Sequence, residues 1–104
     1  MPTITLNGQP LPQGSLEPQA PPWPTTLQDA VDDQLGRLNS FSLYRLRLLP
    51  EQRLSDLYFG WGLGIRHAYG LARGNDALLA SCGARHPDDG AAAIIRAVWR
   101  ALRS

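Results

Sequence analysis

The stretch PEQRLSDLYFGWGLGIRHAY, residues 50–69, predicts the central helix of the fold. Pro50 suits the first turn of a helix, and Glu51 follows at its positive end. On one side, apolar residues recur at spacings of three and four: Leu54, Leu57, Tyr58, Trp61, Ile65 and Ala68. The opposite side carries Phe59, Leu63 and Tyr69. A helix that is apolar nearly all round is typical of a buried, central position.

The same stretch contains Gly60, Gly62 and Gly64, although glycine costs about 1 kcal/mol relative to alanine inside a helix. Gly60, Gly64 and Ala68 share one face at a spacing of four, which predicts the close approach of a neighbouring helix. The glycines are not a dinucleotide-binding fingerprint, because no strand precedes them and the third falls too early.

Further helices are predicted on both sides of this stretch. Thr25 or Thr26 can cap a helix that ends at Asn39-Ser40. Residues 41–49 fit either a strand or a short helix capped by Ser40 or Ser42, and the helical surroundings favour the helix. Asp76 to about Cys82 forms a short helix that ends at Gly83.

The last predicted helix begins after His86-Pro87, with Asp88 as its expected cap and Asp89 at its positive end. A heptad-like apolar stripe runs along it: Ala91, Ile95, Val98 and Leu102. A separate stripe consists of Arg96, Arg100 and Arg103. The two stripes predict an amphipathic helix with one buried side.

The chain divides near residue 24, because seven of its nine prolines fall within residues 1–24. Alternation around Asn7-Gly8 predicts a short hairpin over residues 3–11. A Pro-rich arm follows to Pro24, and we expect Trp23 to dock on the body. The expected fold is mainly α, a compact domain of four to five helices over residues 25–104. The short N-terminal β-hairpin and the Pro-rich arm, residues 1–24, precede it.

Composition excludes several function classes. Ten arginines and nine acidic residues give a net charge of +1, so we expect neither a nucleic-acid nor a membrane partner. No apolar run is long enough to span a bilayer. One cysteine cannot form an internal disulfide, and no signal-peptide pattern is present, so the expected location is cytoplasmic.

Three blocks resemble a family of small bacterial helical domains of unknown function: WPTTLQDAVDDQL at 23–35, YFGWGLGIRHAYGLARGNDALL at 58–79 and HPDDGAAAIIRAVWRAL at 86–102. The middle block resembles the pattern F-G-x-G-x-x-I-R-N-x-x-G-L-W-x-G-N, and the last resembles H-P-D-D-x-S-x-x-I-I. The chain departs from these patterns at His67, Ala72 and Ala91, where they have Asn, Trp and Ser. The resemblance implies an intracellular, mostly helical bacterial domain and no particular activity.

Polar residues gather around the end of the central helix and the start of the last one. This polar hub consists of Arg66, His67, Arg73, Asn75, Asp76, His86, Asp88 and Asp89. In one interpretation Arg66 and Arg73 grip an anionic or polar ligand. In the favoured one Arg66 pairs with Asp88 or Asp89 across two helices, and Asn75 caps the helix after it, because helix ends need caps and counter-charges.

The sequence contains few candidates for catalytic residues. His67 and His86 are the only histidines, and neither a H-E-x-x-H motif nor a cysteine pair accompanies them, so no metal and no cofactor is expected. His67 could act as a general base oriented by Asp88 or Asp89, but no nucleophile stands out. Cys82 fits a small buried hydrophobe. We therefore expect no catalytic residues and favour a role other than an enzyme.

The surface composition leads to the functional hypothesis. The chain has no lysine, and Arg, Tyr and Trp anchor protein interfaces, although GC-rich coding accounts for the same bias equally well. We expect a small cytoplasmic protein-binding module, an immunity or antitoxin-like protein that occludes a partner toxin. One alternative is a ligand-binding or hydrolytic domain that uses the polar hub. Another is an assembly protein or homodimer that adds the N-terminal hairpin as a strand.

Overall fold

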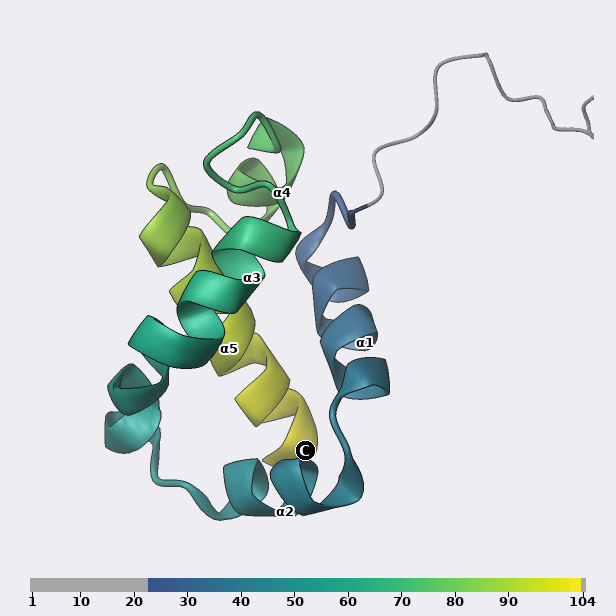
Figure 1. The fold of residues 1–104 in the computed structure, drawn as a ribbon, viewed down its shortest axis with the longest axis vertical. Helices are drawn as coiled ribbons and strands as arrows, with labels where there is room; N and C mark the ends of the chain where they lie inside the picture. The colour runs from purple at the N-terminus through teal and green to yellow at the C-terminus, as the bar shows by residue number, and fades with distance from the viewer. Residues whose placement is uncertain (1–22, 104) are drawn as a thin grey trace, which may run out of the picture.

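The computed structural model describes residues 23–103, which are helical with no strand (Figure 1). The mainly α fold with five α-helices is thus confirmed for these residues. The predicted hairpin over residues 3–11 lies outside them. The helical segments are α1 (Leu27–Arg37), α2 (Ser40–Leu48), η1 (Glu51–Leu57), η2 (Tyr58–Gly62), α3 (Leu63–Ala68), α4 (Asp76–Ser81) and α5 (Pro87–Arg103). Among residues 23–103, no helix is both long and apolar enough to cross a membrane.

The centre of the fold is α5, which packs against each of the other helical segments. Its predicted apolar stripe is confirmed, since Ala91, Ile95 and Val98 are buried and Leu102 packs at the edge of the core. Ile94 is also fully buried, which widens the apolar face of this helix. The assignment of the central position to residues 50–69 was therefore wrong, because α5 occupies it.

Residues 51–68 form three successive helical segments rather than one α-helix. η1 is a 3₁₀ helix, η2 is a single π-helical turn, and α3 continues from it as an α-helix. Only one side of this run packs on α5. On the other side the side chains of Phe59 and Leu63 are 86% and 47% exposed. The prediction of a helix buried all round was wrong, because no described element covers Phe59 and Leu63, although Tyr69, expected on the same side, is buried.

The glycine contact lies on a different face from the predicted one. A Cβ atom added at Gly60 or Gly64 would have open space around it. At Gly62, by contrast, a Cβ would lie 3.6 Å from Cδ1 of Ile95 on α5. The close helix approach therefore occurs at Gly62, and the expectation for the Gly60–Gly64 face was wrong.

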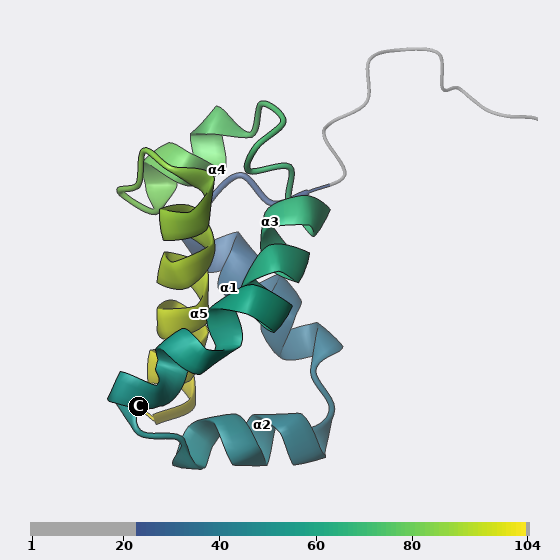
Figure 2. The same ribbon diagram turned by 60° about the vertical axis from the view of Figure 1, so that its left-hand side comes forward.

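Side-chain caps fix the first two helices. Thr26 caps α1, as predicted, by accepting a hydrogen bond from the Asp29 N–H at 3.1 Å. The helical interpretation of residues 41–49 is confirmed, but the cap of α2 is Asn39, which accepts from the Ser42 N–H at 2.8 Å. α2 lies crosswise to α5 at one end of the molecule (Figure 2).

Candidate functional site

Three residues of the polar hub meet around one shallow hollow. Arg66 and His67 come from α3, and Arg73 comes from the loop that connects α3 to α4. Together with Leu63 and Ala72, they line a hollow of about 360 Å³. The remaining hub residues do not line this hollow.

Arg66 is engaged by a neighbouring helix. Its Nη1 donates to Oδ1 of Asp88 at 2.8 Å, and the two side chains are 38% and 62% exposed. The predicted pairing of Arg66 with Asp88 is thus confirmed. Asp88 lies in the first turn of α5, which begins at Pro87, so its expected role as the cap was wrong. Exposed ion pairs of this kind contribute about 0–1 kcal/mol to stability.

Arg73 ties the N-terminal end of the described chain to the loop. Its guanidinium carbon lies 6.0 Å from the ring centroid of Trp23, and its Nη2 donates to the carbonyl oxygen of His67 at 3.2 Å. Trp23 itself packs against Gly70, whose backbone φ is +62°. The expected docking of Trp23 on the body is confirmed.

Asn75 faces the interior and has a structural role. Its Nδ2 donates to the carbonyl oxygens of Pro24 at 2.9 Å and Tyr69 at 2.7 Å. Its Oδ1 accepts from the Leu78 N–H at 3.2 Å, which confirms the predicted cap of α4. Because Asn75 is only 3% exposed and uses both ends of its amide, it is not placed to bind a ligand.

The other hub residues are exposed at helix starts. Asp76 lies in the first turn of α4, Asp89 lies in the first turn of α5, and His86 precedes α5. The carbonyl oxygen of His86 accepts from the Gly90 N–H at 3.0 Å. Among residues 23–103, no group of three or more His, Cys, Asp or Glu side chains could hold a metal ion.

An apolar hollow adjoins the polar one. It has a volume of about 330 Å³, and its lining includes Tyr58, Phe59, Leu63, Asp88 and Ala92. Leu63 borders both hollows, which joins them into one surface. We call this surface the α3 face and define it by Phe59, Leu63, Arg66, His67 and Arg73. The sequence pattern missed its apolar part because Phe59 and Leu63 follow the spacing of core residues.

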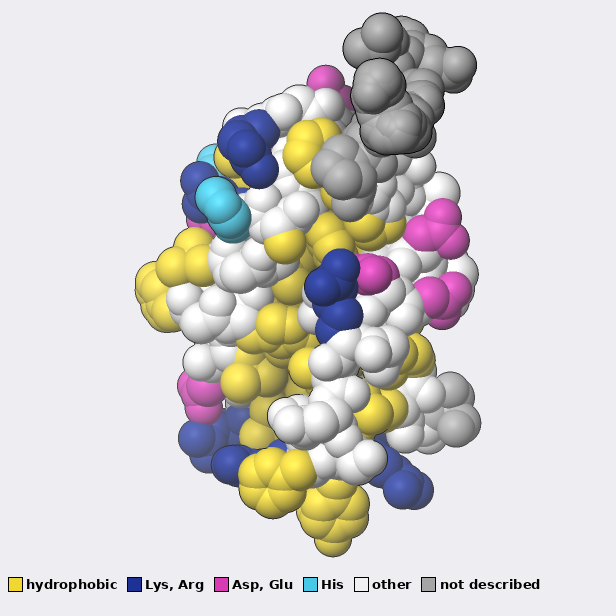
Figure 3. Space-filling model, turned by 45° about the vertical axis from the view of Figure 1, so that its right-hand side comes forward, with side chains coloured by type: hydrophobic (Ala, Val, Ile, Leu, Met, Phe, Trp, Pro, Cys, Tyr) yellow, Lys and Arg dark blue, Asp and Glu magenta, His cyan; other side chains and the backbone are white. Residues whose placement is uncertain are grey.

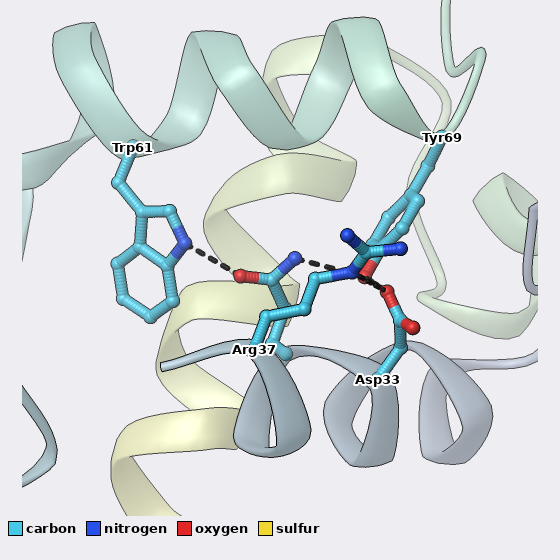
Figure 4. Close-up of polar contacts among 5 residues, drawn as sticks. Asp33, Arg37, Trp61 and Tyr69 are labelled. Atoms are coloured by element: carbon cyan, nitrogen blue, oxygen red, sulfur yellow. Dashed lines mark hydrogen bonds and ion pairs between the residues drawn. The ribbon is translucent and has the colours of Figure 1, made fainter. Parts of the chain in front are cut away.

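The sequence pattern also missed a hydrogen-bond network between α1 and the η2–α3 run, which is buried at Gln34 and Tyr69. Nε1 of Trp61 donates to Oε1 of Gln34, and Nε2 of Gln34 donates to the hydroxyl of Tyr69, both at 2.8 Å. The Tyr69 hydroxyl donates to Asp33 at 2.5 Å, and Nε of Arg37 donates to the same carboxylate at 2.8 Å (Figure 4). The network joins α1 to η2 and to the residue that follows α3.

These contacts shift the pKa of Tyr69 and the pKa of Asp33 in opposite directions. Burial, assisted by the hydrogen bond to Asp33, raises the pKa of Tyr69 to about 12. The hydrogen bonds from Tyr69 and Arg37 lower the pKa of Asp33 below its usual value. Cys82 takes no part in these hydrogen bonds. Burial raises the pKa of its thiol, which disfavours the nucleophilic thiolate.

The comparisons with known proteins give a match to one family model, which covers the described body of the chain. Neither the curated proteins nor the solved structures contain a match to this chain. The model of one family matches residues 23–102, which span the body from Trp23 to the last turns of α5. The chain therefore belongs to the family described as a domain of unknown function, DUF6794.

Proposed function

We propose that this protein is a protein-binding module whose partner docks on the α3 face. The observation that carries the proposal is the 86% exposure of Phe59 beside the 47% exposed Leu63. A large apolar side chain in water loses the free energy that its burial would supply, about 1.5–3 kcal/mol. Contiguous exposed apolar surface typically marks a binding site.

The surroundings of these two residues suit a protein partner. Protein interfaces combine an apolar centre with a polar rim, and Arg and aromatic residues supply most of their binding energy. On the α3 face, Phe59 and Leu63 offer the apolar centre. Arg66, His67 and Arg73 lie on one side of Leu63 and offer the rim.

The partner class that we propose is a toxin, which this protein would occlude as an immunity or antitoxin-like protein in the cytoplasm. The α3 face presents both signs of charge, because Asp88 lies next to Arg66. The net charge of the whole chain is only +1. Both features favour a partner surface of mixed charge over a strongly cationic one.

The experiment uses the product of the open reading frame next to the gene of this protein. We expect that product to arrest growth when expressed alone and to bind the purified full chain in titration calorimetry. The double variant Phe59→Ser/Leu63→Ser should weaken binding by about tenfold or more, because it removes both apolar anchors. The matched control is Phe41→Ser/Leu48→Ser on α2, which should bind as the wild type does.

Two results would contradict the proposal. One is a neighbouring gene product that neither arrests growth nor binds this protein. The other is binding that survives Phe59→Ser/Leu63→Ser unchanged, which would remove the α3 face from the interface. Circular dichroism of each variant checks that its helices are intact.

The two alternatives have less support. An anion-binding or hydrolytic pocket at the polar hub would have to displace Asp88 from Arg66, and it could not use Asn75, which is buried. The assembly or homodimer role of the hairpin stays a prediction, because residues 3–11 lie outside the described part of the chain.

A further inference from the structure

A second exposed apolar surface lies on α2, at the end of the molecule. Phe41, Tyr44 and Leu48 are 67%, 61% and 62% exposed. Their spacing of three and four residues places them in one row along the helix. Leu46, on the opposite side of α2, is buried against the core. We call the exposed row the α2 ridge.

Arginines flank this ridge on both sides. The guanidinium carbon of Arg45 lies 5.6 Å from the Phe41 ring centroid. On the other side, Arg103 stacks over Trp99 at 4.6 Å and donates to the carbonyl oxygen of Arg47 at 3.0 Å. None of Arg45, Arg47 and Arg103 has an ion-pair partner among residues 23–103. Figure 3 shows apolar side chains projecting at this end with arginine atoms to either side.

The near-neutral total charge conceals a separation of charge along the molecule. α2, η1 and the second half of α5 carry six arginines against Glu51 and Asp56, a net side-chain charge of +4. The other described residues carry four arginines against six aspartates, a net side-chain charge of −2. The end of the molecule that bears the α2 ridge is therefore basic.

We propose that the α2 ridge docks this protein on the surface of an anionic lipid bilayer, with α2 lying in the plane of the interface. Tyr is favoured at the boundary between headgroups and acyl chains, Phe and Leu insert beside it, and Arg side chains reach back to lipid phosphates. The inner side of α2 is apolar as well, because Leu46 packs on the core, so the proposal rests on the exposure of this row and the arginines beside it. This proposal replaces the expectation, drawn from the net charge of +1, that the protein has no membrane partner. The docking is peripheral and compatible with a cytoplasmic location.

Two hollows beside the ridge support a lipid surface. Arg47, Leu48 and Arg103 line an open hollow of about 430 Å³, which offers two guanidinium groups to one headgroup phosphate. On the side of Arg45, an apolar groove of about 360 Å³ extends the apolar surface, and Trp61 forms part of its lining. Apolar side chains line this hollowed part of the surface in Figure 3.

The charge of this end argues against a second copy of the chain as the occupant. A symmetric dimer through the α2 ridge would bring two ends of charge +4 together, and like charges at short distance repel. A bilayer instead meets the convex ridge without a complementary hollow and supplies negative charge around it. An acidic protein would also supply negative charge, and vesicle binding distinguishes that occupant from lipid.

The test measures partition of the purified full chain onto vesicles of equal parts phosphatidylglycerol and phosphatidylethanolamine, by co-sedimentation at low salt. We expect binding to these vesicles, little binding to phosphatidylcholine alone, and release at about 1 M salt, where the screening length falls to about 3 Å. Phe41→Ser/Leu48→Ser and Arg45→Gln/Arg47→Gln should each lower partition by about tenfold or more. The assay needs no protein partner, so its result is independent of the proposed function.

Matched controls lie on other surfaces. Phe59→Ser/Leu63→Ser removes exposed apolar side chains of the same two types from the α3 face, and Arg85→Gln removes an exposed arginine before α5. Both should bind vesicles as the wild type does. The proposal is overturned if the wild type does not bind anionic vesicles, the result expected of a surface for an acidic protein. It is also overturned if Phe41→Ser/Leu48→Ser binds normally, or if that variant instead abolishes a self-association measured without vesicles.

Discussion

The side-chain amide of Gln34 donates to the hydroxyl of Tyr69 at 2.8 Å in the interior of the molecule. The same amide accepts from the indole N–H of Trp61 through its oxygen. One glutamine on α1 thus pairs with polar groups of Trp61 within η2 and of Tyr69, the residue that follows α3. Because buried polar groups are costly when unpaired, this arrangement fixes how α1 sits against α3.

We predict that Gln34→Leu lowers the free energy of unfolding by about 1–3 kcal/mol, because it leaves the Trp61 N–H without its acceptor. Urea unfolding followed by circular dichroism measures the change. The control is Gln28→Leu on the same helix, which removes only an exposed contact with Asp32 and should change stability by less than about 0.5 kcal/mol. Equal effects of the two variants would show that the buried contact adds nothing.

We predict that the folded protein loses stability at alkaline pH because of Tyr69. Its pKa is about 12 in the folded protein, above the ordinary value of 10.0 for a tyrosine, so folding favours the neutral phenol. Its contribution is fully present below pH 10.0 and is lost as pH rises toward about 12. Tyrosinate absorbance should show a component near pH 12 that Tyr69→Phe removes. The same late component in Tyr69→Phe would contradict the assignment.

The features that could be predicted are those encoded by residues close together in the sequence, such as helical periodicity and helix caps. The stripe of Ala91, Ile95 and Val98 follows the helical period, and it is buried in α5. Thr26 and Asn75 are caps because their side chains reach backbone N–H groups only a few residues away. Such signals depend on neighbours in sequence, so they do not require knowledge of the tertiary fold.

The exposed surfaces could not be predicted in the same way. Phe59 follows the spacing of a core residue, but its exposure depends on which elements cover η2, and no local pattern encodes that. The pairing of Gln34 with Tyr69 joins residues that are 35 apart in sequence. The basic end likewise forms only because α2 packs against the end of α5. The net charge of +1 therefore does not indicate that positive charge gathers there.

Substitution of Gly70 tests whether Trp23 packs against this residue. A Cβ atom at Gly70 would lie 2.5 Å from the Trp23 ring, and the backbone φ is +62°. Gly70→Ala should therefore cost about 1–2 kcal/mol for the backbone conformation and about 1–3 kcal/mol more for displacing the ring. Gly83→Ala is the matched control, because its φ is +68° and open space surrounds its Cβ position. Equal losses of stability in urea unfolding would mean that Trp23 does not pack on Gly70.

We predict that replacing Asn75 destabilises the fold more than the loss of an exposed helix cap, because its side chain serves three backbone partners. Asn75→Ala removes the bonds to the carbonyls of Pro24 and Tyr69 together with the cap on Leu78, and it should cost about 2–4 kcal/mol in urea unfolding. Asn39→Ala, which removes the exposed cap of α2, should cost only about 1 kcal/mol.

Asn75→Asp separates the two roles of this side chain. The aspartate keeps an oxygen that can accept from the Leu78 N–H, so the cap on α4 is retained. It loses both donor bonds and places a carboxylate against the carbonyl oxygens of Pro24 and Tyr69. We therefore expect Asn75→Asp to unfold at a urea concentration close to that of Asn75→Ala. Stability equal to the wild type would mean that the cap carries the whole effect and that the tie from α4 to Pro24 contributes nothing.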